Sequence, residues 1–143
     1  MDARTVLDLM PFARQCGIEV VAAEADLVTG SLPWSPERCT AGGVMHGAAL
    51  MALADSLGAV CAVLNLPDGS TTTTIESKTN FFRGLRDGTA RASSRPLHVG
   101  RTTIVVQTDI SDGEGRRLAQ VTQTQAVLHP AGSRTPDPGR AEG

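Results

Sequence analysis

The stretch GGVMHGAALMALADSLGAVCAVLNL, residues 42–66, decides the fold of this chain. Its only carboxylate is Asp55 and its only imidazole is His46. An apolar run of this length without proline is too long for a strand, so it predicts a helix over 47–64 that the Asn-Leu-Pro sequence at 65–67 ends. Because the run is apolar nearly all round, we expect the helix to be buried on most sides.

A membrane span is the alternative for this run, since its length approaches the roughly 20 residues that a span needs. Three observations count against a span. The central Asp55 would cost about 3 kcal/mol on insertion scales. No Lys or Arg cluster flanks the run, and no Trp or Tyr belt marks its ends. The many Gly and Ala residues also suit a buried helix against a sheet, so we expect a protein without a membrane segment.

Composition narrows the other possibilities. The 143 residues fit one domain, which we place at 1–129, followed by a Pro/Gly-rich tail over 130–143 that should be disordered. A net charge of −2 and 3% aromatic residues argue against a nucleic-acid partner. Three widely spaced cysteines without a CxxC motif, and an N-terminus without a signal sequence, favour the cytoplasm. The histidine spacing predicts no metal site.

Alternating, β-branched segments surround the central run. A short helix over 5–10 and a second turn reaching Cys16 precede two strands within 18–34, joined near 25–26. Four further strands are predicted at 71–83, 89–99, 101–111 and 116–128. Short turns between consecutive strands predict an antiparallel sheet. The fold class is therefore α+β, with about six strands curled around one long helix, and because one helix cannot cover both sheet faces, a face or an edge should pair with another copy.

Asp55 is the first candidate for chemistry. No side chain one helical turn away can pair with it, so we read it as a buried carboxylate acting as base or nucleophile. The alternative is a solvated or lysine-paired charge. Gly47, at the helix start, offers a backbone N–H and the positive end of the helix dipole to an oxyanion, although it can also be an ordinary loop-to-helix glycine.

His46 precedes Asp55 by nine residues. On one straight helix this places the two side chains half a turn out of phase and about 13 Å apart along the axis. They cannot meet within one helix, so a shared site would need a second subunit. The alternative for His46 is a residue that bonds backbone at the helix start.

The His-Gly-Ala sequence at 46–48 and the Leu-Ala-Asp sequence at 53–55 resemble the signature of the hotdog-fold acyl-CoA thioesterases. The pattern is most similar to the phenylacetate-pathway (PaaI-like) branch of the 4-hydroxybenzoyl-CoA thioesterase superfamily, over about residues 10–128. The resemblance implies acyl-CoA hydrolysis without a cofactor, in a homodimer or homotetramer with each site at a dimer interface. It implies that the Gly47 N–H polarises the thioester carbonyl and that Asp55 of the partner chain attacks it or activates water. His46 would hold the thioester end.

The resemblance also implies substrate contacts. Thr74 and Glu76 would lie beside the thioester and the pantetheine arm, and Phe81 near an acyl or pantetheine wall. The segment 98–102 is similar to the turn that meets CoA. The candidates on that turn are His98, Gly100, Arg101 and Thr102, and further candidates for the phosphates are Arg83, Arg86 and Arg95.

Two positions depart from the family pattern. Relatives usually carry Asn or Gln six residues before the motif histidine, and here that position is Thr40. Its shorter hydroxyl predicts either a water in place of the amide or weaker catalysis. The second motif glycine is Ala48, which can narrow the site slightly. The main alternative function is therefore a non-catalytic hotdog module that binds acyl-CoA or a protein; a hotdog hydratase or dehydratase fits the spacing less well.

Overall fold

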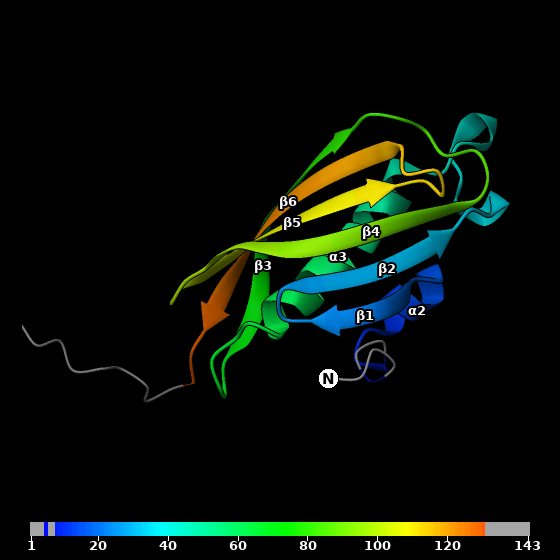
Figure 1. Ribbon diagram of the computed structural model, residues 1–143. Helices are drawn as coiled ribbons and strands as arrows, with labels where there is room; N and C mark the ends of the chain where they lie inside the picture. Colours follow the sequence, from blue (N-terminus) through cyan, green and yellow to red (C-terminus); the bar gives the residue numbers. More distant parts are fainter. Residues whose placement is uncertain (1–4, 6–7, 131–143) are drawn as a thin grey trace, which may run out of the picture.

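The computed structural model describes residue 5 and residues 8–130, and it places one long helix against one face of a six-stranded antiparallel sheet (Figure 1). This confirms the predicted hotdog architecture, with the long helix and all six strands within a few residues of their expected bounds. The elements, in chain order, are α2 (Pro11–Cys16), β1 (Glu19–Glu24), β2 (Leu27–Pro33), the 3-10 turns η1 (Pro36–Arg38) and η2 (Ala41–Gly43), α3 (Gly47–Val63), β3 (Thr71–Phe81), β4 (Thr89–Val99), β5 (Thr103–Ser111) and β6 (Arg117–Leu128).

The N-terminal helices are only partly covered by the described residues. Thr5 and Asp8 are helical, and the rest of the helix expected over 5–10 falls partly on residues 6–7, which lie outside the description. The second turn is the helix α2, which begins at Pro11 because proline fits the first helical position. Gly17, with φ of 79°, ends it in the left-handed conformation. Apart from Pro130, the predicted tail also lies outside the described residues.

The strand order is β1-β2-β4-β5-β6-β3. Hairpins join β1 to β2, β4 to β5 and β5 to β6 in the antiparallel sense, as the short turns predicted. The strand β3 does not pair with the next strand along the chain but with β6, which places β3 at the far edge of the sheet. The connection from β3 to β4 crosses the end of the sheet, where the Phe82 N–H donates to the Leu118 carbonyl at 2.8 Å.

The core lies between α3 and the inner face of the sheet. Leu53 and Leu57 of α3 are fully buried, and each buried leucine contributes about 2 kcal/mol. The alternation predicted for β6 is confirmed: one set of side chains points inward and is buried, and the intervening set lies on the outer face. The inward-facing set runs from Val121 through Gln123 and Gln125 to Val127.

One stripe of α3 is exposed. Ala48, Met51 and Asp55 are exposed at helical spacing. The prediction that Asp55 is buried is therefore wrong for the single chain. The apolar content of the run indicated burial, but the sheet covers only one side of α3, and the described part of the chain supplies no layer over this stripe. None of the described helices combines the length and the hydropathy that crossing a bilayer requires.

Candidate active site

The start of α3 presents an unused backbone donor. His46 caps the helix with an extended backbone, and its Nδ1 accepts from the Ala48 N–H at 3.0 Å. The His46 carbonyl accepts from the Ala49 N–H at 2.9 Å. Within the described residues this leaves the Gly47 N–H without an acceptor. A free N–H at the positive end of a helix dipole is suited to bind an oxygen that gains negative charge.

A folded-back loop fixes this helix start. The His46 N–H donates to the Arg38 carbonyl at 2.7 Å, and the Thr40 N–H donates to the Val44 carbonyl at 2.9 Å. The side chain of Thr40 is exposed and does not cap the following 3-10 turn. Thr40 therefore lies in the loop that leads to His46, but it lines neither of the two cavities beside α3 described below.

The connection from β3 to β4 runs beside the same loop. The Met45 N–H donates to the Leu85 carbonyl at 2.8 Å, and the Arg86 guanidinium donates to the Gly42 carbonyl at 2.7 Å. Arg83, in the same connection, is exposed. Two of the predicted phosphate-binding arginines are thus placed in the segment that borders the start of α3.

Phe81 lies against Gly47. A Cβ added to Gly47 would be 3.0 Å from the Cζ of the Phe81 ring, so only glycine leaves the ring undisturbed there. The Phe81 side chain is 51% exposed at the end of β3. The structure thus brings together two residues predicted for one site.

The Asp55 carboxylate has a partner that the sequence did not reveal. Its Oδ1 accepts a hydrogen bond from Nε2 of Gln123 at 2.5 Å. Partial burial by the surrounding helix and sheet raises the pKa of Asp55 above its ordinary value, and the Gln123 hydrogen bond opposes that rise. The sequence contained one signal for this contact: Gln123 occupies a core-facing position, where a polar side chain needs a partner.

Polar side chains of β3 and β6 extend this contact. The Thr74 hydroxyl accepts from Gln125 at 2.9 Å and from Gln123 at 3.4 Å. Glu76 lies on the other face of the sheet, where its carboxylate accepts from the Thr124 hydroxyl at 3.4 Å. An irregularity in the pairing between Thr74 and Glu76 separates the two. Of this predicted pair, Thr74 alone joins the Asp55 network.

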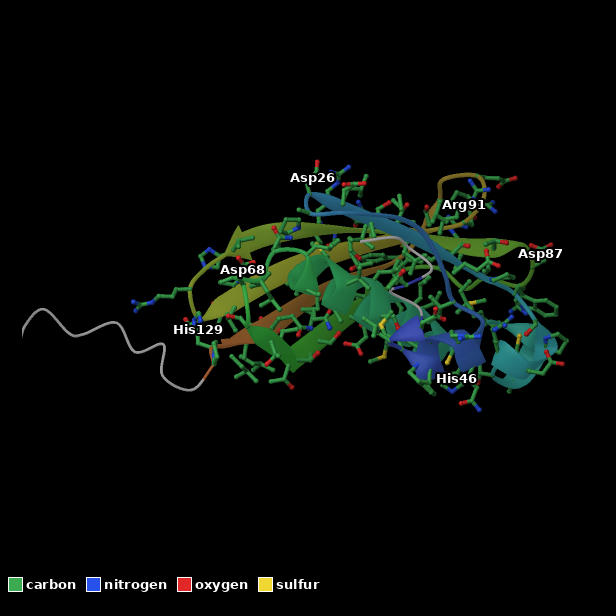
Figure 2. All side chains as sticks on the ribbon, turned by 90° about the horizontal axis from the view of Figure 1, so that it is seen from below. Asp26, His46, Asp68, Asp87, Arg91 and His129 are labelled. Carbon is green, nitrogen blue, oxygen red and sulfur yellow. The ribbon has the colours of Figure 1, made fainter. Side chains whose placement is uncertain are left out.

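Two cavities run along the exposed side of α3. One, of about 640 Å³, is lined by His46, by side chains of α2, β2 and α3, and by the charged side chains Glu37 and Arg38 of the η1 turn. The other, of about 320 Å³, is lined by Asp55, Met51 and Ser77. Both are also lined by residues 12, 48 and 52, so they are neighbours. Figure 2 shows His46 beside α2.

The phase argument for His46 and Asp55 needs correction. His46 has φ of −61° and ψ of 136° and precedes the helix, so the helical angle per residue does not apply to it. Both side chains line neighbouring cavities on one side of α3. Within α3, Gly47 and Asp55 are about 12 Å apart along the axis, which still keeps the helix start and the carboxylate apart within one chain.

The segment 98–102 lies elsewhere in the single chain. It forms the turn between β4 and β5, closed by the Gly100 N–H, which donates to the Thr103 carbonyl at 2.8 Å. The Arg101 carbonyl is 2.8 Å from Nε2 of His129. His129 lies at the end of the molecule opposite His46 (Figure 2). The turn residues that lie away from Gly47 are therefore His98, Gly100, Arg101 and Thr102, and Arg95 lies within β4, paired with Gln107.

Comparisons with known proteins agree with the fold and identify the family. The family model described as the thioesterase superfamily matches residues 42–119. The chain is 27% identical to the proofreading thioesterase EntH of Cronobacter turicensis over 128 residues, which cover 90% of this chain and 93% of that protein. It is 30% identical to the 1,4-dihydroxy-2-naphthoyl-CoA hydrolase of Escherichia coli over 103 residues, covering 72% and 76%. A crystal structure of a mutant thioesterase from Pseudomonas aeruginosa matches with a TM-score of 0.85 and 28% identity, covering 90% of this chain and 94% of that one.

Proposed function

Because this chain belongs to the thioesterase superfamily, whose members hydrolyse thioesters, we propose that it cleaves acyl-CoA thioesters with Gly47 of one protomer and Asp55 of a second. The observation that carries the proposal is the free Gly47 N–H at the start of α3, on the helix that bears the Asp55 carboxylate. The similarity to a protein named as an acyl-CoA hydrolase supports the choice of CoA thioesters.

Each side chain has a role in the proposed reaction. The carbonyl oxygen of the thioester accepts from the Gly47 N–H, and the helix dipole stabilises the negative charge that develops on it. In the neutral imidazole of His46, Nδ1 accepts from the Ala48 N–H, so the proton resides on Nε2 and can be donated to the substrate. His46 thereby orients the thioester. The Asp55 carboxylate either attacks the carbonyl carbon and expels CoA as a thiolate, or takes a proton from the water that attacks. In the first case the acyl group is left on Asp55 as an anhydride, which water then hydrolyses to the free acid and the carboxylate.

Two chains are needed to assemble this site. Gly47 and Asp55 lie about 12 Å apart along one helix, whereas reacting atoms must come within about 3.5 Å. Among the described residues no strand pairs with the outer edge of β3, which lies beside both residues and carries Ile75, 61% exposed. An antiparallel pairing of β3 with the same strand of a second copy would join the two sheets and cover this edge. The resulting homodimer can pair again into a homotetramer.

Basic side chains border the proposed site. Arg83 and Arg86 lie in the connection beside the start of α3, where their guanidinium groups can meet the phosphates of CoA. The segment 98–102 is distant from Gly47 of its own chain, so in this proposal it reaches CoA only from the partner protomer or at the far nucleotide end.

Thiol release from a panel of acyl-CoAs tests the function. Phenylacetyl-, benzoyl- and medium-chain acyl-CoA are incubated with the purified protein, and free CoA is followed with a thiol reagent. We expect the best member of the panel to be hydrolysed with kcat/KM of about 10⁴ M⁻¹s⁻¹ or more. Binding of these compounds without thiol release would instead favour a non-catalytic module.

The oligomeric state gives a second test. Light scattering should report a dimer or a tetramer, and Ile75→Lys, which adds a positive charge to each of the two β3 edges that would pair, should shift the protein toward monomer. Activity should fall in proportion to the monomer fraction. Leu97→Lys is the matched control, since Leu97 is 58% exposed on β4 away from this edge and should leave the dimer intact. A fully active monomer would contradict the two-chain site.

A further inference from the structure

A buried glutamine reaches from the sheet to the candidate catalytic carboxylate. The Gln123 side chain is 1% exposed on the inner face of β6, and its Nε2 donates to Oδ1 of Asp55 at 2.5 Å. At the other end of the same amide, Oε1 is buried without a hydrogen-bond partner among the described residues. A buried acceptor without a partner is unfavourable for folding. The side-chain amide of Gln123 is therefore oriented for the hydrogen bond to Asp55, at the cost of leaving its own Oε1 without a partner.

The helix α3 has a glycine, Gly58, at the point where the Gln123 side chain packs against it. Gly58, three residues after Asp55 and so on the same side of α3, is buried, and a Cβ at this position would overlap Oε1 of Gln123. Glycine inside a helix is unfavourable relative to alanine. The room that Gly58 leaves for the Gln123 side chain explains why a glycine is found inside this helix.

A second buried glutamine on the same strand provides a contrast. Gln125 is also 1% exposed, but both ends of its amide are used by β3. Its Nε2 donates to the Thr74 hydroxyl at 2.9 Å, and its Oε1 accepts from the Thr72 hydroxyl at 3.1 Å. Gln125 has no contact with Asp55 among the described hydrogen bonds. The two glutamines thus differ at both ends of the amide: only Gln123 donates to Asp55, and only Gln125 has a partner for its Oε1 among the described residues.

We propose that Gln123 is a positioning residue for Asp55, which holds Oδ1 and so leaves Oδ2 as the oxygen that faces the thioester. Within the described residues Oδ2 has no hydrogen-bond partner, which leaves it free to attack the carbonyl carbon or to accept a proton from water. This inference rests on the proposed function of Asp55. It adds a residue on β6 that contacts neither substrate nor reacting atoms and acts only through the carboxylate.

The hydrogen bond also affects the charge of the carboxylate. Partial burial raises the pKa of Asp55 and the Gln123 donor lowers it, because a donor favours the ionised form. Removing the donor should therefore raise the pKa, and the acid limb of the pH–rate profile should move to higher pH. The other side chains that line the Asp55 cavity, from α2, α3 and β3, are uncharged. The neighbouring cavity carries the ionisable groups His46, Glu37 and Arg38, and none of them has a hydrogen bond to Gln123 among the described residues. A limb that moves in Gln123→Met and not in Gln125→Met is therefore assigned to Asp55.

Paired methionine substitutions test the proposal on the full chain. Gln123→Met should lower kcat about 10-fold or more, as expected for the loss of a hydrogen bond to a charged group, and should move the acid limb to higher pH. KM should stay within about 2-fold of the wild-type value, since the proposed role of Gln123 does not include binding the substrate in its ground state. The midpoint of thermal unfolding should be unchanged or higher, because the unsatisfied Oε1 is removed.

The control variant should show the opposite pattern. Gln125→Met should lower the unfolding midpoint, because it deprives two threonine hydroxyls of a partner, while its pH–rate profile should match that of the wild type. Gly58→Ala should displace Gln123 from the helix side and shift the acid limb in the same direction as Gln123→Met. The double variant Gly58→Ala/Gln123→Met should shift the acid limb of the pH–rate profile no further than Gln123→Met alone.

The outcomes separate this inference from the proposed function. An unchanged kcat and acid limb in Gln123→Met, together with an inactive Asp55→Asn, would overturn the positioning role alone. Equal effects of the two glutamine variants on rate, pH profile and unfolding would also overturn it, since both residues would then act only in folding. An active Asp55→Asn would instead overturn the proposed function of the carboxylate.

Discussion

Replacement of Asp55 by asparagine should lower the turnover of acyl-CoA by about 10³-fold or more, the scale seen when a catalytic carboxylate or nucleophile is removed. Asparagine has the same size, and its carbonyl oxygen can still accept from Gln123, but the amide is neither a nucleophile nor a base. Because Asp55 is exposed in the single chain, the change should not disturb the core. Steady-state thiol release measures the loss, and circular dichroism and thermal unfolding establish that the fold is retained.

Asp68→Asn is the matched control for this variant. Asp68 is exposed and lies at the end of the molecule opposite His46 (Figure 2). Asp68→Asn removes one negative charge, as Asp55→Asn does, so it controls for any effect of net charge on activity. We expect Asp68→Asn to hydrolyse every acyl-CoA at the wild-type rate. Wild-type hydrolysis by Asp55→Asn would contradict the mechanism.

The parts of the fold that depend on local signals were predictable. The bounds of α3 follow from the length of one apolar run and the proline after it, and the hairpins follow from alternation and short turns. The edge position of β3 was not predictable in this way. Alternation shows that a segment is a strand but not which strand lies beside it. The strand β3 lies next to β6 in the sheet although β4 and β5 separate the two in the sequence.

The site shows the same division. Asp55 and His46 became candidates because each is the only residue of its kind in the apolar run, and Gly47 because it lies at the helix start. The expected burial of Asp55 was wrong because hydropathy records the apolar content of a helix and not the number of layers that cover it. Gln123 was assigned only to a strand face. Its partner is 68 positions away in the chain, and the contact depends on how α3 packs against β6.

Replacement of Gly47 by proline should remove the proposed oxyanion donor while keeping the helix. Proline suits the first position of a helix, where its missing N–H has no helical partner, and His46 before it already has the extended backbone that proline requires. Loss of one such donor typically lowers kcat by about 10²- to 10³-fold. Gly47→Ala is the control, since both variants place a Cβ near Phe81 and alanine retains the N–H. Similar rates for the two variants would show that the N–H is not used.

Mixing the two inactive variants tests whether one site draws on two chains. In a dimer of Gly47→Pro with Asp55→Asn, one site combines the intact glycine of one chain with the intact aspartate of the other, and the second site carries both changes. Random assortment of equal amounts places half of the protein in such mixed dimers, so activity should return to about a quarter of the wild-type value, given isologous pairing. If Gly47 and Asp55 acted within the same chain, each site would keep one defect and mixing would restore nothing. Recovery therefore requires that the start of α3 in one chain and the middle of α3 in its partner meet at one thioester.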